Sequence, residues 1–131
     1  MSTRAIVEPM TQTSVYVLLF IDIILTVSAQ LLLRSGAQRL SGTKLSLEII
    51  FEPLKNGFLL GGIILYGISF FLYVFILSKL QLNIVYPIST GVILILITLG
   101  SYFLLKETIY TTQIVGIAAI LIGIVLVLLP R

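Results

Sequence analysis

The chain has 131 residues, of which 59% are hydrophobic and only 10% are charged, and its mean hydropathy is +1.21. Soluble domains carry roughly 25% charged residues, so this chain is too apolar to be covered by water, and its length allows a single domain, residues 1–131. It has no Cys and no His, which excludes disulfides and the usual zinc and haem ligands, and its net charge of +3 is too small and scattered for a nucleic-acid partner.

The predicted elements are four membrane-spanning helices. A bilayer core needs about 20 apolar residues in a helix. Four runs reach that length, at about residues 15–34, 58–78, 84–105 and 110–129. They lack the alternation of a membrane barrel, and a helix satisfies its own backbone in lipid. The sequence therefore predicts an all-α, multi-pass integral membrane protein.

The first span carries a polar residue at every fourth position, namely Asp22, Thr26, Gln30 and Arg34. At 100° per residue each step drifts by about 40°, so these side chains form one row about 18 Å long. A charge at the bilayer centre costs at least about 3 kcal/mol on insertion scales, so we expect the row to face a bundle interior or a wet cavity and to bind a polar substrate there. Other interpretations stay open. Arg34 also suits snorkelling to the headgroups, Gln30 a hydrogen bond between helices, and Thr26 a bond to its own backbone.

The connection 35–57 is the longest of the chain. Charged residues recur in it at i, i+4, i+8 and i+11, namely Lys44, Glu48, Glu52 and Lys55. Ile49, Ile50 and Leu54 lie away from that charged stripe. The pattern predicts either a short amphipathic helix on the membrane surface or an ordinary solvated loop. Pro53 disfavours helix at the residue before it, so we expect it to divide the surface piece from the second span.

The second span contains an aromatic row, Tyr66, Phe70 and Tyr73, at i, i+4 and i+7. Such a row fits simple packing, and it also fits stacking on a sugar or contact with an isoprenoid tail. Tyr66 is therefore a predicted substrate-binding residue.

The third span opens with NIVYPISTG, residues 83–91. Tyr86 and Thr90 are i, i+4 neighbours that present their hydroxyls together, and Ser89 lies beside them. These three residues are further predicted substrate contacts. Pro87 lacks a backbone donor, so it either starts the helix or kinks it.

The fourth span has a stripe of small residues, Gly116, Ala119 and Gly123, at i, i+3 and i+7. Small residues let two helices approach closely in lipid, and the alternative is packing within one subunit. Four helices form a thin bundle that can hardly enclose a polar cavity alone. We therefore predict a homodimer, or a heterodimer with a paralogue, through this face.

Three segments carry a family resemblance: LTVSAQLLLRSG in the first span, IVYPIST opening the third, and LLKETIYTTQIVGIAAILIGIVLV leading into the fourth. In this order they resemble the small multidrug resistance branch of the drug/metabolite transporter superfamily (EamA-like). Within the branch they look most like the small subunits proposed to flip undecaprenyl-phosphate-linked aminoarabinose. The resemblance implies a protein of the bacterial inner membrane. Drug exporters of the branch use a first-span Glu and a Trp, whereas alignment on Arg34 places Thr26 at the Glu position and this chain has no Trp.

These patterns favour a membrane transporter or flippase for a lipid-linked polar headgroup, a polyprenyl-phosphate sugar, with membrane lipid as its surroundings. Arg34 would hold the phosphate, where a guanidinium makes bidentate contacts, and the other predicted residues would hold the headgroup. One alternative is a proton-coupled exporter of small cations or polyamines that uses Asp22. Another is a non-transporting membrane subunit that stabilises a partner such as a glycosyltransferase. No catalytic constellation is evident, so we expect no enzyme activity, cofactor or metal.

Overall fold

The computed structural model describes residues 12–40 and 47–130, and that part of the chain contains helices and no strand. The elements in chain order are α2 (Gln12–Ala37), the 3-10 helix η1 (Gln38–Leu40), α3 (Glu48–Lys55), α4 (Gly57–Leu77), α5 (Leu82–Phe103) and α6 (Thr111–Leu128). Four of the described helices, α2 (continued by η1), α4, α5 and α6, are long and apolar enough to cross a membrane. The prediction of an all-α, multi-pass integral membrane protein is confirmed.

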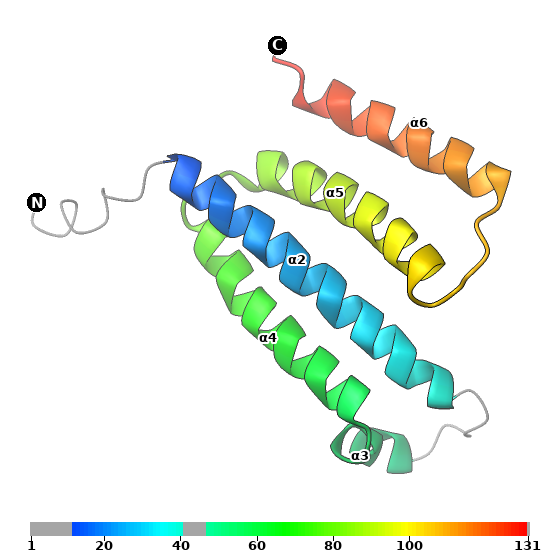
Figure 1. The fold of residues 1–131 in the computed structure, drawn as a ribbon. Coiled ribbons are helices and arrows are strands. Elements are labelled where there is room, and N and C mark those ends of the chain that lie inside the picture. The colour runs from blue at the N-terminus through cyan, green and yellow to red at the C-terminus, as the bar shows by residue number, and fades with distance from the viewer. Residues whose placement is uncertain (1–11, 41–46, 131) are drawn as a thin grey trace, which may run out of the picture.

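Helix α2 runs through the middle of the arrangement and packs against both α4 and α5 (Figure 1). Helices α2 and α4 lie side by side and run in opposite directions, and a tight connection joins the end of α4 to the start of α5. Helix α6 packs against α5, on the side away from α2, and none of its residues is buried. The polar row therefore lies on α2, the helix that packs against both α4 and α5.

The buried core follows one stripe of α2. Val15, Leu19, Ile23 and Val27 recur every four residues and pack with Ile76 at the end of α4 and Val85 at the start of α5. Most other large apolar side chains are exposed over the outer faces of the helices. An apolar surface of that extent is unfavourable in water and fits contact with lipid.

Small residues bring α2 and α4 close together. A Cβ atom added at Gly62 of α4 would lie 2.7 Å from Leu33 Cγ and 3.1 Å from the Ala29 carbonyl oxygen. One added at Gly36, at the end of α2, would lie 2.7 Å from Leu59 Cγ. Close approach of backbones is a main source of helix association in lipid, so these glycines hold the α2–α4 pair.

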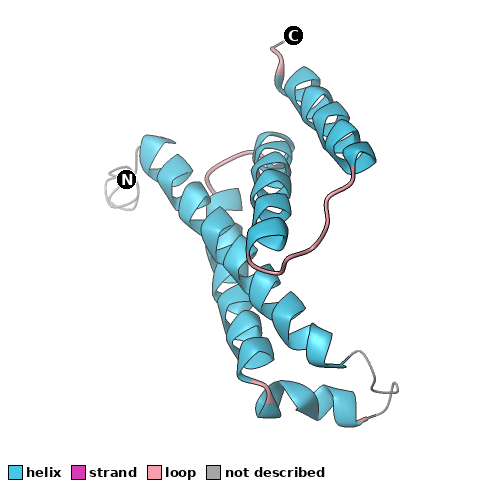
Figure 2. Ribbon diagram, turned by 45° about the vertical axis from the view of Figure 1, so that its right-hand side comes forward, coloured by secondary structure: helices cyan, strands magenta, loops and turns pink. Residues whose placement is uncertain are grey.

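Of the two predictions for the first connection, the structure confirms a short helix, α3, but this helix ends at a different residue from the one predicted (Figure 2). The prediction that Pro53 divides it from the next span is wrong, because α3 continues through Pro53 to Lys55 and the break falls at Asn56. A proline keeps a helical φ and loses one backbone hydrogen bond, which water can replace at a surface. The Asn56 side chain accepts from the Phe58 amide (3.1 Å) and donates to the Gly36 carbonyl (3.2 Å), and this cap fixes the break. The predicted stripe member Lys44 lies outside the described residues.

Pro87 lies inside α5, which begins at Leu82, so it does not start the helix. After α5 the chain turns through Lys106, whose φ of 57° is in the left-handed region. The amide of Glu107 then donates to the Ser101 carbonyl at 3.0 Å. This connection carries Glu107 back toward the end of α2.

Candidate functional site

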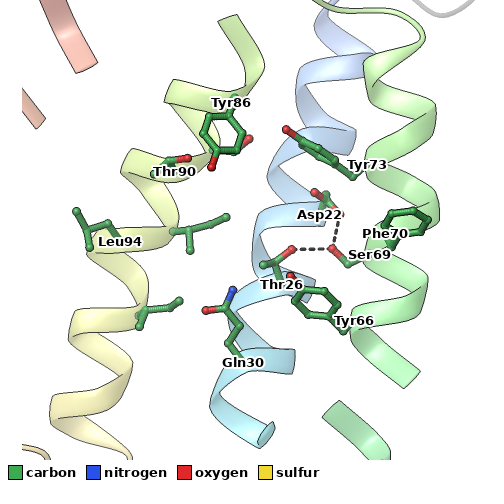
Figure 3. A pocket seen from close by; sticks show the side chains of 13 residues that line it. Asp22, Thr26, Gln30, Tyr66, Ser69, Phe70, Tyr73, Tyr86, Thr90 and Leu94 are labelled. Carbon is green, nitrogen blue, oxygen red and sulfur yellow. Dashed lines mark hydrogen bonds between the residues drawn. The ribbon is translucent and has the colours of Figure 1, made fainter. Parts of the chain in front are cut away.

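A cavity of about 420 Å³ lies between α2, α4 and α5 (Figure 3). Its lining comprises Asp22, Thr26 and Gln30 of α2, Tyr66, Ser69, Phe70 and Tyr73 of α4, and Tyr86, Ser89, Thr90, Ile93, Leu94 and Ile97 of α5. The polar face of α2 forms its floor, because α2 lies between the other two helices. Drug-sized ligands occupy sites of roughly 300–1,000 Å³, so the cavity suits a small ligand group.

Three polar side chains of the cavity form a hydrogen-bonded chain. Ser69 donates to Asp22 Oδ1 at 2.6 Å, and the Ser69 and Thr26 hydroxyl oxygens are also 2.6 Å apart. A hydroxyl has one proton, which Ser69 gives to Asp22, so Thr26 is the donor in the second bond. Asp22 is only 3% exposed. Its carboxyl group is therefore held in place by Ser69 of the facing helix α4, which is itself bonded to Thr26, one turn along α2.

The α5 wall carries a hydroxyl that is not hydrogen-bonded. Ser89 is buried, and its Oγ finds no hydrogen-bond partner within the described part of the chain. Thr90 and Tyr86 line the same wall (Figure 3). Buried polar groups are nearly always paired, so an orphan Oγ in a cavity wall indicates a place for a ligand or water.

Aromatic side chains form the rim. Tyr66 and Phe70 of α4 and Tyr86 of α5 line the cavity while remaining exposed at the protein surface. The cavity is therefore open between α4 and α5, toward the outer surface of the described chain. Tyrosine offers an apolar ring with a polar tip, which suits a boundary between a polar site and acyl chains.

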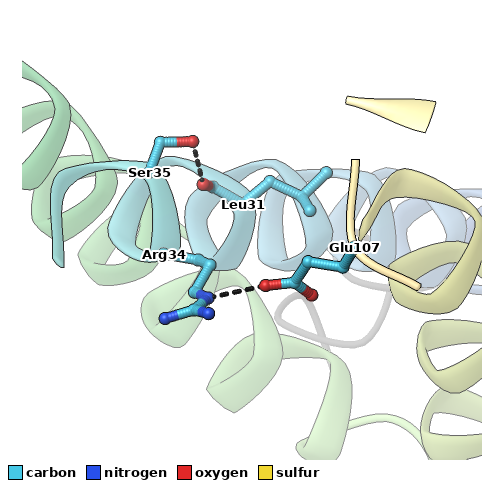
Figure 4. Close-up of polar contacts among 4 residues, drawn as sticks. All are labelled: Leu31, Arg34, Ser35 and Glu107. Atoms are coloured by element: carbon cyan, nitrogen blue, oxygen red, sulfur yellow. Dashed lines mark hydrogen bonds and ion pairs between the residues drawn. The ribbon is translucent and has the colours of Figure 1, made fainter. Parts of the chain in front are cut away.

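Arg34 lies apart from the cavity. Its Nε donates to Glu107 Oε1 at 2.9 Å, so it joins the end of α2 to the α5–α6 connection (Figure 4). The two side chains are 55% and 34% exposed, so the pair contributes at most about 1 kcal/mol to stability. Arg34 is thus held beside a carboxylate near the end of its span.

The structure brings seven of the eight predicted substrate-binding residues to one cavity, the exception being Arg34. Thr26 bonds to Ser69 rather than to its own backbone. The sequence pattern did not predict two polar partners, Ser69 for Asp22 and Glu107 for Arg34. A signal existed for Ser69, which is the one serine or threonine in residues 58–77 and follows Tyr66 by three positions, on the same side of the helix.

The stripe predicted for dimerisation lies on the outside of the chain. A Cβ atom added at Gly116 or Gly123 would meet nothing within 4 Å in the described structure, and Ala119 is exposed. The contact of α6 with α5 uses other residues, because Leu121 and Ile124 approach Gly91. The stripe is free to meet a second helix, and the dimer stays a prediction.

No group of three or more His, Cys, Asp or Glu side chains that could hold a metal gathers within residues 12–40 and 47–130. No protein-family model matches the chain, and no solved structure matches it.

Proposed function

We propose that the protein is a membrane transporter or flippase that carries the polar headgroup of a lipid-linked substrate, a polyprenyl-phosphate sugar, past the apolar interior of the bilayer. The observation that supports this most is the hydrogen-bonded chain of Asp22, Ser69 and Thr26 in an open cavity, in which Asp22 and Ser69 are buried. An acid within a membrane span is costly and is a functional-site hypothesis by default. A protein that only needed to cross the membrane would not require it.

The shape of the cavity supports a lipid-linked ligand. Its polar floor is formed by α2, and its aromatic rim opens sideways between α4 and α5. A sugar can enter through this opening while its isoprenoid tail stays in the acyl chains. The orphan Ser89 hydroxyl and the neighbouring Thr90 would then hydrogen-bond the sugar hydroxyls.

The spacing along α2 supports two successive positions for the ligand. Gln30 is about 6 Å along the helix from Arg34, whereas Asp22 is about 18 Å away. A sugar phosphate can span the first distance and not the second. We therefore place the phosphate at Arg34 while the sugar reaches Gln30, and the sugar at Asp22 later in transit. The phosphate would compete with Glu107 for the Arg34 guanidinium.

A second candidate is the export of small organic cations or polyamines. Asp22 is the acid of the cavity, Tyr66 and Tyr86 stand at its rim, and no Lys or Arg is among the described residues that line it. A carboxylate together with aromatic rings is a favourable environment for an ammonium group. An amino sugar would satisfy the same residues.

Flipping measured in liposomes tests the proposal. The purified protein should accelerate the movement of a fluorescent polyprenyl-phosphate sugar between leaflets, and Asp22→Asn and Ser89→Ala should each slow it. Thr98→Ala is the matched control on α5, because Thr98 donates to the Leu94 carbonyl at 2.7 Å and does not line the cavity. A cation flux that depends on Asp22, without lipid flipping, would favour the exporter. No transport of either substrate would favour the non-transporting subunit.

A further inference from the structure

Helix α3 carries an apolar stripe that no part of the described chain covers. Leu47, just before the helix, and Ile50, Phe51 and Leu54 within it are spaced at i, i+3, i+4 and i+7. They are 58–77% exposed. This spacing places them on one side of a helix, in a band about 100° wide.

The stripe is separate from the side of α3 that packs on the protein. Ile49 and Pro53 are half-buried and lie about 130° around the helix from the centre of the stripe. Helix α3 packs against α4. The contact with the rest of the chain is therefore already made by another side, and the stripe is available to something else.

The position of α3 indicates what covers the stripe. Asn56 is the single residue between α3 and the membrane-spanning helix α4, so the end of α3 lies within about 8 Å of the start of that span. The Asn56 side chain is tied to the Gly36 carbonyl at the end of α2, which fixes this junction. Helix α3 lies across the end of the α2–α4 pair (Figure 2). It is therefore held at the boundary between hydrocarbon and water.

Two cations lie at the same end of the molecule. The Arg39 guanidinium carbon is 4.9 Å from the centre of the Phe58 ring in the first turn of α4, and Lys55 is the last residue of α3. Basic side chains at this depth meet the phosphate groups of lipids. Phe58 and Leu60, in the first turn of α4, are further exposed apolar side chains close to the end of α3.

We propose that α3 is an interfacial helix whose stripe of Leu47, Ile50, Phe51 and Leu54 inserts into the bilayer, with Lys55 and Arg39 at the level of the phosphates. The helix then holds the α2–α4 end at a fixed depth. This inference does not depend on the proposed transport function, because it rests on the exposure and position of α3.

Fluorescence of a single tryptophan tests it, because the natural chain contains none. Phe51→Trp places the reporter on the stripe, and Ile122→Trp places a reference on the exposed surface of α6, near the middle of that span. Both proteins are reconstituted in phosphatidylcholine brominated either high on the acyl chain or near its methyl end. A helix in the interface buries its apolar face about 5–10 Å below the headgroups, so the reporter at residue 51 should be quenched more by the high bromines. The reference should be quenched more by the deep bromines.

Each other result overturns the proposal. Quenching at residue 51 by aqueous acrylamide, without quenching by either bromine, would place the stripe in water. Protection from both acrylamide and the bromines would show that protein covers it. Stronger quenching by the deep bromines would place α3 in the membrane interior. Leu54→Trp provides a second reporter on the same stripe if Phe51→Trp does not fold.

Discussion

Replacing Gly62 by alanine tests the close approach of α2 and α4, on which the position of the polar row depends. The new Cβ atom would lie 2.7 Å from Leu33 Cγ and 2.9 Å from Leu33 Cδ2. It would also lie 3.1 Å from the Ala29 carbonyl oxygen, which cannot rotate away as a side chain can. We therefore expect α4 to shift away from α2.

The magnitude follows from two opposing effects. Overpacking a tight contact costs about 1–3 kcal/mol. Alanine in a helix interior is favoured over glycine by up to about 1 kcal/mol. Gly67→Ala in the same helix isolates the second effect, because a Cβ atom there meets nothing within 4 Å in the described structure. The free energies of unfolding of the two variants should thus differ by about 1–3 kcal/mol, with Gly62→Ala the less stable.

Reversible unfolding in mixed micelles, followed by helical circular dichroism at increasing dodecyl sulfate, measures this difference. A parallel distance measurement between spin labels on α2 and α4 should show a longer separation in Gly62→Ala only. Equal stabilities for the two variants, with unchanged distances, would refute the close packing of these helices.

Three further predictions concern the ends and the outer face of the molecule. Glu107→Gln should change the free energy of unfolding by less than about 1 kcal/mol and should raise the affinity for polyprenyl phosphate, since Arg34 loses its competing carboxylate. Arg34→Lys should weaken polyprenyl-phosphate binding about tenfold. Lipid binding that neither change affects would contradict the phosphate role of Arg34. Gly116→Leu combined with Gly123→Leu should leave insertion intact and weaken the dimer, and unchanged cross-linking in membranes would count against that interface. Lys106→Gly should stabilise the protein by about 1 kcal/mol in thermal unfolding, because the φ of 57° is costly for lysine; a loss of stability would show that the lysine side chain matters more.

The polar row of α2 was predictable because its members lie on a single helix. Spacing alone places Asp22, Thr26 and Gln30 on one side, and their cost in lipid requires that side to face inward. The side of α4 that packs against α2 was not predictable in the same way. That helix has no charged residue, and one serine with two tyrosines marks its inner side much more weakly than an acid does. Ser69 could therefore be identified as the hydrogen-bond partner of Asp22 only from the three-dimensional structure.

Contacts between distant parts of the chain account for the remaining differences. The boundary between α3 and α4 falls at Asn56 rather than at Pro53, because the Asn56 side chain binds the carbonyl of Gly36, 20 residues earlier. The pairing of Arg34 with Glu107 joins residues 73 apart and depends on how the α5–α6 connection turns. Local propensity does not encode either contact.

Access to the cavity is the central claim, and modification of a single cysteine tests it most directly, since the chain has no Cys of its own. Ser89→Cys places a thiol in the cavity wall, and Val125→Cys places one on an exposed side of α6 away from the Gly116/Ala119/Gly123 stripe. Thiols react with water-soluble methanethiosulfonates as thiolates, which form poorly in apolar surroundings. The cavity predicts that Ser89→Cys reacts faster than Val125→Cys and that a polyprenyl-phosphate sugar slows the reaction of Ser89→Cys. Equal rates for the two thiols, unaffected by the lipid, would contradict a polar cavity that takes this headgroup.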